Sequence, residues 1–99
     1  DDLPADLPAR FRREAAARSL AIASVTGTFN MCHPDPAQRQ LGLRRLRVLA
    51  EAFPRLPIHI CTGTRNPASM WRRHPDNATP EAWRDMAACV REAADIARQ

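Results

Sequence analysis

Two short apolar runs end in the same polar sequence and are predicted to be strands. They cover residues 20–25 and 58–61, are too short for helices, and contain the Ile and Val side chains that strands favour. Continuous apolar runs of this kind are typical of parallel strands covered on both faces. Each run leads into a Thr-Gly-Thr sequence, whose glycine lets the chain leave the strand. We therefore predict two parallel strands, each followed by a loop.

Three longer segments have the spacing of amphipathic helices: residues 8–18, 36–53 and 80 onward. The apolar positions expected to pack on the sheet are Leu41, Leu46, Leu49 and Phe53 in the second segment, and Trp83, Met86, Ala87, Val90, Ala94 and Ala97 in the third. Because Trp83 shares this spacing, we expect it in the core. Helices that alternate with strands predict an α/β fold with a parallel sheet.

Capping sequences mark where these helices begin. Asp35 precedes a first-turn proline and has a Gln three residues further on, which is the pattern of a capping box. Thr79 is followed in the same way by Pro80 and Glu81. Asp6 stands where it would cap the first helix. The starts of the second and third helices are therefore the best-defined boundaries in the sequence.

The two strands belong to an internal repeat. The sequence of residues 24–30 returns in similar form at 60–66, and each copy is followed by His-Pro-Asp, at 33–35 and at 74–76. A repeat of about this length is one βα unit. Because the carboxyl ends of parallel strands meet at one edge of a sheet, we expect the two loops after the strands to lie side by side there.

Polar side chains in these loops form a candidate substrate site. Its proposed members are Asn30, His33, Thr62, Arg65, Trp71 and His74. For the two histidines three interpretations stay open: a rigid turn whose aspartate caps the next helix, a substrate contact, or a metal ligand. Trp71 either lines a ligand pocket or folds back onto the ends of the strands. His59 lies within a strand and is expected either to point to the inner side of the sheet or to pack under a helix, and not to bind a ligand.

Composition narrows the possible functions. Hydrophobic residues make up 44%, too many for a disordered chain, and no apolar run approaches the ~20 residues that span a bilayer. We therefore expect a soluble, cytoplasmic protein without a membrane partner. Fifteen basic and eleven acidic residues give a net charge of +4, but every basic residue is Arg and these are dispersed. We expect no nucleic-acid binding from such a distribution.

Three cysteines are spread along the chain without close pairing. Cys32, Cys61 and Cys89 lack the C-x-x-C spacing of zinc ribbons and redox motifs, so we expect reduced thiols. Cys61 and Cys89 lie among apolar residues and are expected to be buried, which leaves Cys32 as the reactive candidate. The sequence contains no glycine-rich phosphate loop, paired-carboxylate site or zinc-protease helix. The catalytic residues are therefore unknown, and no metal ligand is proposed.

The motifs of the two repeat copies resemble those of the sugar phosphate isomerase/epimerase family, which has the xylose isomerase-like TIM barrel. The resemblance lies in Thr-Gly-Thr-Phe-Asn-Met and His-Pro-Asp at 26–31 and 33–35, and in Cys-Thr-Gly-Thr-Arg, Met-Trp and His-Pro-Asp-Asn at 61–65, 70–71 and 74–77. It implies that residues 1–99 are one partial domain of a (β/α)8 barrel, from the first to the third helix with strands two and three. The ends at Asp1 and Gln99 are accordingly expected to be cuts.

The resemblance also implies a chemistry for the parent enzyme. Family members bind a divalent metal ion (Mn, Mg or Zn) through Glu, Asp, His and Glu on later strands, and two of the carboxylates move a proton beside a sugar carbonyl. These positions lie outside residues 1–99, so we expect the fragment alone to be inactive. The implied ligand is a sugar or sugar phosphate, contacted by the loops that carry His33 and residues 71–74.

Two alternatives remain beside this isomerase or epimerase hypothesis. The related endonuclease IV barrels use histidines of corresponding loops as zinc ligands and cleave DNA, so a metal-dependent phosphodiesterase is one alternative. The other is a non-catalytic α/β binding module. Because two strands leave unpaired edges, either the missing part of a barrel or a second copy is expected to complete the sheet.

Overall fold

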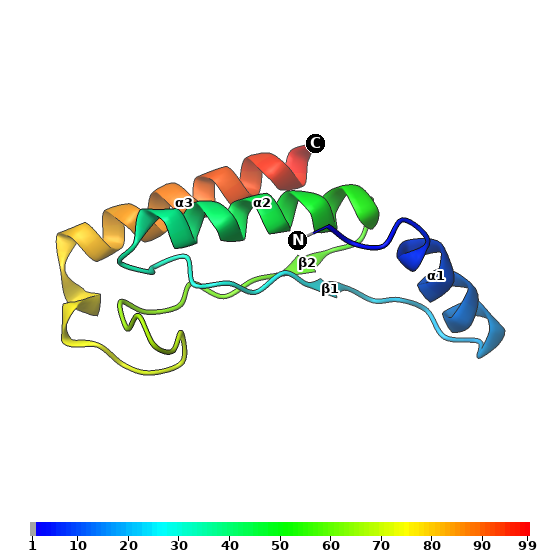
Figure 1. The fold of residues 1–99 in the computed structure, drawn as a ribbon, viewed down its shortest axis with the longest axis horizontal. Coiled ribbons are helices and arrows are strands. Elements are labelled where there is room, and N and C mark those ends of the chain that lie inside the picture. Colours follow the sequence, from blue (N-terminus) through cyan, green and yellow to red (C-terminus); the bar gives the residue numbers. More distant parts are fainter. Residues whose placement is uncertain (1) are drawn as a thin grey trace.

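The computed structural model describes residues 2–99 and shows a mixed α/β fold. Figure 1 shows the elements in chain order: α1 (Leu7–Ala17), β1 (Val25–Thr26), α2 (Pro36–Ala52), β2 (Ile58–His59), the 3-10 helix η1 (Pro75–Ala78) and α3 (Pro80–Arg98). The predicted order of helices and strands is confirmed. None of the helices within residues 2–99 is long and apolar enough to cross a membrane.

The two strands pair in parallel, as predicted, but over only two residues each. Val25 lies opposite Ile58, and the amide of Gly27 donates to the carbonyl of His59 at 2.9 Å. The predicted strands at 20–25 and 58–61 were too long. In this register residues 20–24 face residues 53–57, where α2 ends in a turn that contains two prolines. Proline cannot complete a ladder, so pairing begins only after Pro57.

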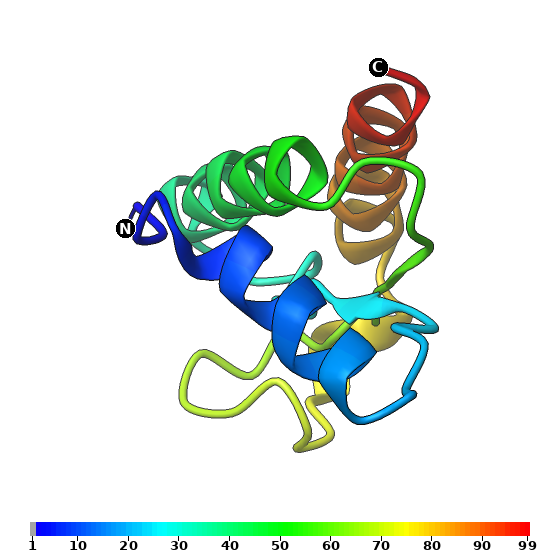
Figure 2. The same cartoon turned by 90° about the vertical axis from the view of Figure 1, so that its right-hand side faces the viewer.

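Helices α2 and α3 pack against each other and cover one face of this small sheet (Figures 1 and 2). The buried core consists of Met31, Leu43, Leu46, Cys89, Ala93 and Ile96, with Phe29, Ala50, Ile58, Ile60 and Val90 partly buried against it. Because side chains alternate along a strand, His59 next to Ile58 points to the opposite face. It is exposed there, so it does not pack under a helix; it lies on the face of the sheet that the helices leave open.

Helix α3 faces the core with small side chains, which corrects the prediction for Trp83. Ala82, Cys89, Ala93 and Ile96 are buried, whereas Trp83 is 67% exposed. Small residues let two helices approach closely, and this requirement sets the inward face of α3 about one residue away from the predicted stripe. In α2 the predicted positions Leu46 and Phe53 are buried.

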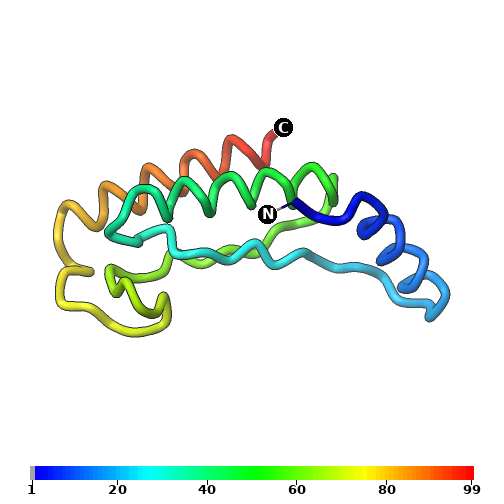
Figure 3. The backbone as a smooth tube through the Cα atoms, in the orientation of Figure 1, coloured from blue at the N-terminus to red at the C-terminus, as the bar shows by residue number. Residues whose placement is uncertain are grey.

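The helix starts follow the capping predictions with one exception. The side chain of Asp35 accepts from the amide of Ala37 at 2.9 Å, and Thr79 Oγ1 accepts from the amide of Ala82 at 3.2 Å. Asp6 occupies the N-cap position of α1 but makes no capping hydrogen bond there. Helix α1 contains no buried residue and lies at the end of the molecule opposite to residues 62–79 (Figure 3). It is the most peripheral element.

Gly42 lets α2 lie against Phe29, and this contact yields a stability prediction. A Cβ on Gly42 would lie 2.0 Å from the Phe29 ring. Elsewhere in a helix, Gly→Ala stabilises by about 1 kcal/mol. We expect Gly42→Ala instead to lower the free energy of unfolding by about 1–3 kcal/mol through overpacking, measured by urea denaturation followed by circular dichroism. Gln40→Ala, at an exposed position of α2, is the control and should change it little. A stabilising Gly42→Ala would contradict the Phe29 contact.

Candidate functional site

Asn30 joins the two copies of the repeat at the carboxyl end of the sheet. Its Oδ1 accepts from the amides of Thr64 at 3.0 Å and Cys32 at 3.1 Å, and its Nδ2 donates to the Thr64 carbonyl at 2.8 Å. Gly63 passes directly over the side chain: its φ is +81°, and a Cβ there would lie 2.1 Å from Asn30 Oδ1. The prediction that the two loops meet is confirmed. Both ends of the Asn30 amide are used in joining them.

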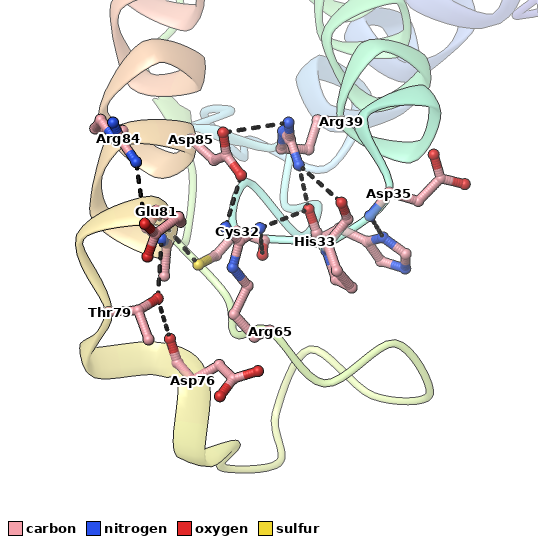
Figure 4. Close-up of polar contacts among 12 residues, drawn as sticks. Cys32, His33, Asp35, Arg39, Arg65, Asp76, Thr79, Glu81, Arg84 and Asp85 are labelled. Atoms are coloured by element: carbon pink, nitrogen blue, oxygen red, sulfur yellow. Dashed lines mark hydrogen bonds and ion pairs between the residues drawn. The ribbon is translucent and has the colours of Figure 1, made fainter.

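Arg65, a proposed substrate residue, is buried and bonded within the protein. Its Nη2 donates to Asp85 Oδ2 of α3 at 2.7 Å, and its Nη1 donates to the carbonyls of Cys32 and His33 at 3.4 Å each (Figure 4). Asp85 also pairs with Arg39 of α2, at 3.5 Å between Oδ1 and Nη2. We call Arg39, Arg65 and Asp85 the arginine–aspartate cluster. It ties α2, α3 and both loops together.

Arg39 and Asp85 were not recognised from the sequence as site residues. A signal for Asp85 was present, because it lies three residues after Ala82 and four before Cys89, on the buried face of α3. A carboxylate on a buried helix face requires a cation beside it. Asp85 can therefore be predicted to form a buried ion pair only when the buried face of α3 is already known.

The two His-Pro-Asp sequences form the same turn. His33 Nδ1 accepts from the amide of Asp35 at 3.0 Å, and His74 Nδ1 accepts from the amide of Asp76 at 3.2 Å. Each histidine therefore holds its own turn, and Nε2 is the ring nitrogen left for a ligand. Within residues 2–99 no three His, Cys, Asp or Glu side chains are grouped so that they could hold a metal ion.

A surface hollow of about 600 Å³ lies between the second loop and the start of α3. Its lining residues are Pro34, Arg65, Pro67, His74, Asp76, Thr79, Glu81 and Asp85. Of the proposed site residues, Arg65 and His74 line it. Asn30 lies outside this lining and bonds to Thr64, the residue before Arg65. His33 also lies outside it, and its carbonyl accepts from Arg65. Thr62 is exposed, and Trp71 is 72% exposed, so that it lines neither this hollow nor the core.

Two of the three thiols are buried, including the one expected to react. Cys32 is 7% exposed and its Sγ donates to the carbonyl of Ala82 at 3.7 Å. Burial raises the pKa of the Cys32 thiol, although the charge of Arg65 opposes this. Burial also raises the pKa of Cys89 from 9.0 to about 11. The expectation of a reactive Cys32 was therefore wrong, and Cys61, which is partly exposed, is the accessible thiol.

Comparison of the chain with family models, curated proteins and solved structures finds no match. The resemblance to sugar phosphate isomerases therefore rests on the repeat motifs within residues 26–35 and 61–77. The geometry of the two loops and the hollow is independent of it.

Asp85→Asn tests the arginine–aspartate cluster. Removing the charge leaves two buried guanidinium groups with no anion between them, so we expect the free energy of unfolding to fall by about 1–3 kcal/mol in urea denaturation. Asp95→Asn, on the same helix, is the matched control. Asp95 pairs with Arg98 at 2.6 Å but both side chains are largely exposed, so its loss should cost less than about 1 kcal/mol. Equal losses for the two variants would contradict a structural role of the cluster.

Thiol labelling tests the assignment of the cysteines. With Ellman's reagent at pH 8 we expect one thiol of the native chain to react quickly, and Cys61→Ser to abolish that fast phase. Raising the pH to 9 should not bring Cys89 into the fast phase, because its pKa of about 11 keeps it protonated. Cys32→Ser should leave the fast phase intact. Loss of the fast phase in Cys32→Ser would restore Cys32 as the reactive thiol.

Proposed function

We propose that this chain is part of a (β/α)8 barrel of the sugar phosphate isomerase/epimerase type and that its two loops help to bind the sugar. One observation carries the proposal: Asn30 bonds two equivalent βα loops side by side, with 3.0 Å between its Oδ1 and the Thr64 amide. In barrels of parallel strands the ligand lies at the carboxyl ends of the strands, among such loops. The hollow that His74 lines opens beside them.

The arrangement of layers supports a partial barrel. Helices α2 and α3 lie on the same face of the sheet (Figure 2). Thr26 and His59, which alternate with the inward-facing Ile58 and its partner Val25, are exposed on the opposite face. A complete doubly wound sheet has helices on both faces, and one half of it has them on one face only. In a barrel, by contrast, the helices form one outer layer and the sheet closes on itself. An uncovered inner face and open strand edges are what a part of such a barrel would have.

The proposed reaction needs a metal ion and a carboxylate that residues 1–99 do not supply. A divalent metal ion, bound by residues of later strands, would polarise the sugar carbonyl while a carboxylate removes the adjacent proton. The role of residues 1–99 would be to bind and orient the sugar. The loops are suited to this because Asn30 and the arginine–aspartate cluster hold them rigidly, leaving His74 to face the ligand.

The unpaired strand edges favour one second candidate, a non-catalytic α/β binding module that oligomerises. Within residues 2–99, β1 and β2 are each other's only neighbours in the sheet. Open edges of parallel strands recruit further strands, from the same chain or from another copy. The metal-dependent phosphodiesterase alternative finds no such support, because Nδ1 of both His33 and His74 accepts a backbone hydrogen bond, which leaves a neutral ring with its hydrogen on Nε2.

The decisive experiment uses the full-length product of the gene that encodes these residues. If the proposal holds, the gene continues past Gln99 with a strand that ends in Glu, about one helix-to-strand connection away. The purified protein should then catalyse exchange of the hydrogen beside the carbonyl of ketoses or their phosphates with D₂O, followed by NMR. EDTA should abolish the exchange, and Mn²⁺ or Mg²⁺ should restore it.

Residues 1–99 expressed alone are the negative control and should show no exchange. A stop codon directly after Gln99, or a full-length protein without metal-dependent exchange on any sugar, would overturn the isomerase proposal. Dimers in analytical ultracentrifugation together with a stop codon would establish the oligomeric module in its place.

A further inference from the structure

The hydrogen bonds of the two histidines determine which ring nitrogen carries the proton. In a neutral imidazole one nitrogen is a donor and the other an acceptor. The Nδ1 atoms of His33 and His74 both accept from backbone amides, at 3.0 and 3.2 Å. With Nδ1 as the acceptor, a neutral ring carries its hydrogen on Nε2. Nδ1 of His74 also lies 3.8 Å from Oδ2 of Asp76, which is beyond hydrogen-bond distance. A ligand that meets Nε2 finds a hydrogen-bond donor there, and neither a base nor a free metal ligand.

The ring of His74 is also held in a fixed orientation. It is 31% exposed, and the turn behind it is closed by the carbonyl of Asp76, which accepts from Thr79 Oγ1 at 2.7 Å. One residue further, Asn77 Oδ1 accepts from the amide of Arg65 at 2.7 Å. The turn is thus attached both to the start of α3 and to the first part of the second loop. The donor is oriented before any ligand arrives.

The charges around the hollow do not favour an anion. Three carboxylates line it, those of Asp76, Glu81 and Asp85, against the single guanidinium of Arg65. Figure 4 shows how this guanidinium is used: it bonds to Asp85 and to the carbonyls of Cys32 and His33. Arg84 is paired with Glu81 at 3.2 Å. The hollow is therefore lined by the carboxylates of three residues and by the imidazole of His74, without the surplus arginines that phosphate recognition uses.

We propose that His74 binds a neutral polyhydroxyl ligand, an unphosphorylated sugar, by donating Nε2–H to one of its oxygen atoms. Hydroxyl groups both donate and accept, so the same ligand can donate to the carboxylates of Asp76 and Glu81. This inference rests on the proposed sugar-binding function. Of the two ligands considered there, a sugar and a sugar phosphate, it selects the unphosphorylated sugar for this hollow. It also makes His74 a binding residue and not a metal ligand.

Nitrogen NMR of the histidine rings tests the donor assignment directly. In the full-length protein, labelled with ¹⁵N at histidine and studied at pH 8, His33 and His74 should each show a protonated Nε2 and an unprotonated Nδ1. His59, which is not part of a His-Pro-Asp turn, is the internal reference. A protonated Nδ1 in His74 would overturn the proposal. This readout does not depend on catalysis, so the exchange assay on the same protein can succeed or fail independently.

Titration with D-fructose and with D-fructose 6-phosphate tests the ligand class. D-fructose should shift the His74 Nε2 signal, and the phosphate should bind there no more tightly. His74→Asn retains an acceptor for the Asp76 amide, as in an Asx-turn, but lacks the imidazole donor. We expect it to keep the fold and to weaken fructose binding about threefold to tenfold, the usual worth of one neutral hydrogen bond.

His33→Asn is the matched comparison, because it alters the equivalent turn outside the hollow and should weaken binding less than His74→Asn does. Three results would each overturn the proposal: no shift of His74 with D-fructose, tighter binding of the phosphate at His74, or equal weakening by the two Asn variants.

Discussion

Two hydrogen bonds between Asn30 and Thr64 hold the loops of the two repeat copies together, and the arrangement of the candidate site depends on them. A parallel ladder of two residues per strand is too short to fix the loops that follow it. The equivalent residue in the second copy, Asn66, has a different role: its Oδ1 accepts from the amides of Ala68 and Ser69 and closes its own loop. The same residue type thus bridges to the next loop in the first copy and folds back in the second.

The arginine–aspartate cluster explains why a charged residue of the second loop is structural. Arg65 stands where the first copy of the repeat has Phe29, which packs against Gly42 of α2. Arg65 is buried as well, but its charge requires an anion, which α3 supplies through Asp85 at 2.7 Å. The repeat therefore preserves an inward-pointing side chain at this position and changes how its burial is compensated: by packing in one copy and by an ion pair in the other.

Local signals in the sequence predicted local structure well. The caps at Asp35 and Thr79 located the starts of α2 and α3, because a cap depends only on neighbouring residues. Strand length was overestimated because it depends on what lies opposite, which here is a turn ending at Pro57.

Predictions that depended on contacts between distant segments were less successful. The residues next to Trp83 and Cys32 in the sequence do not determine which distant segments pack against these two side chains. The burial of Cys32 against Ala82 and the exposure of Trp83 follow from how closely α3 approaches the first loop and α2. The meeting of the two loops was predictable, because it follows from parallel strand order alone. Asn30 and Arg65, however, were expected to face a ligand, and the structure uses both to hold the loops.

The two interpretations of the His-Pro-Asp sequences, a rigid turn and a ligand contact, do not exclude each other. The amide of Asp76 that closes the turn occupies Nδ1 of His74, and this same bond decides that Nε2 carries the hydrogen. If the turn served folding alone, Nε2 of His74 would have no function of its own. Because His74 lines a hollow rich in carboxylate oxygens, its donor complements a ligand that carries several hydroxyl groups. In the proposed site, folding and recognition are linked through one imidazole ring, because the hydrogen bond that closes the turn also decides which nitrogen can donate to a ligand.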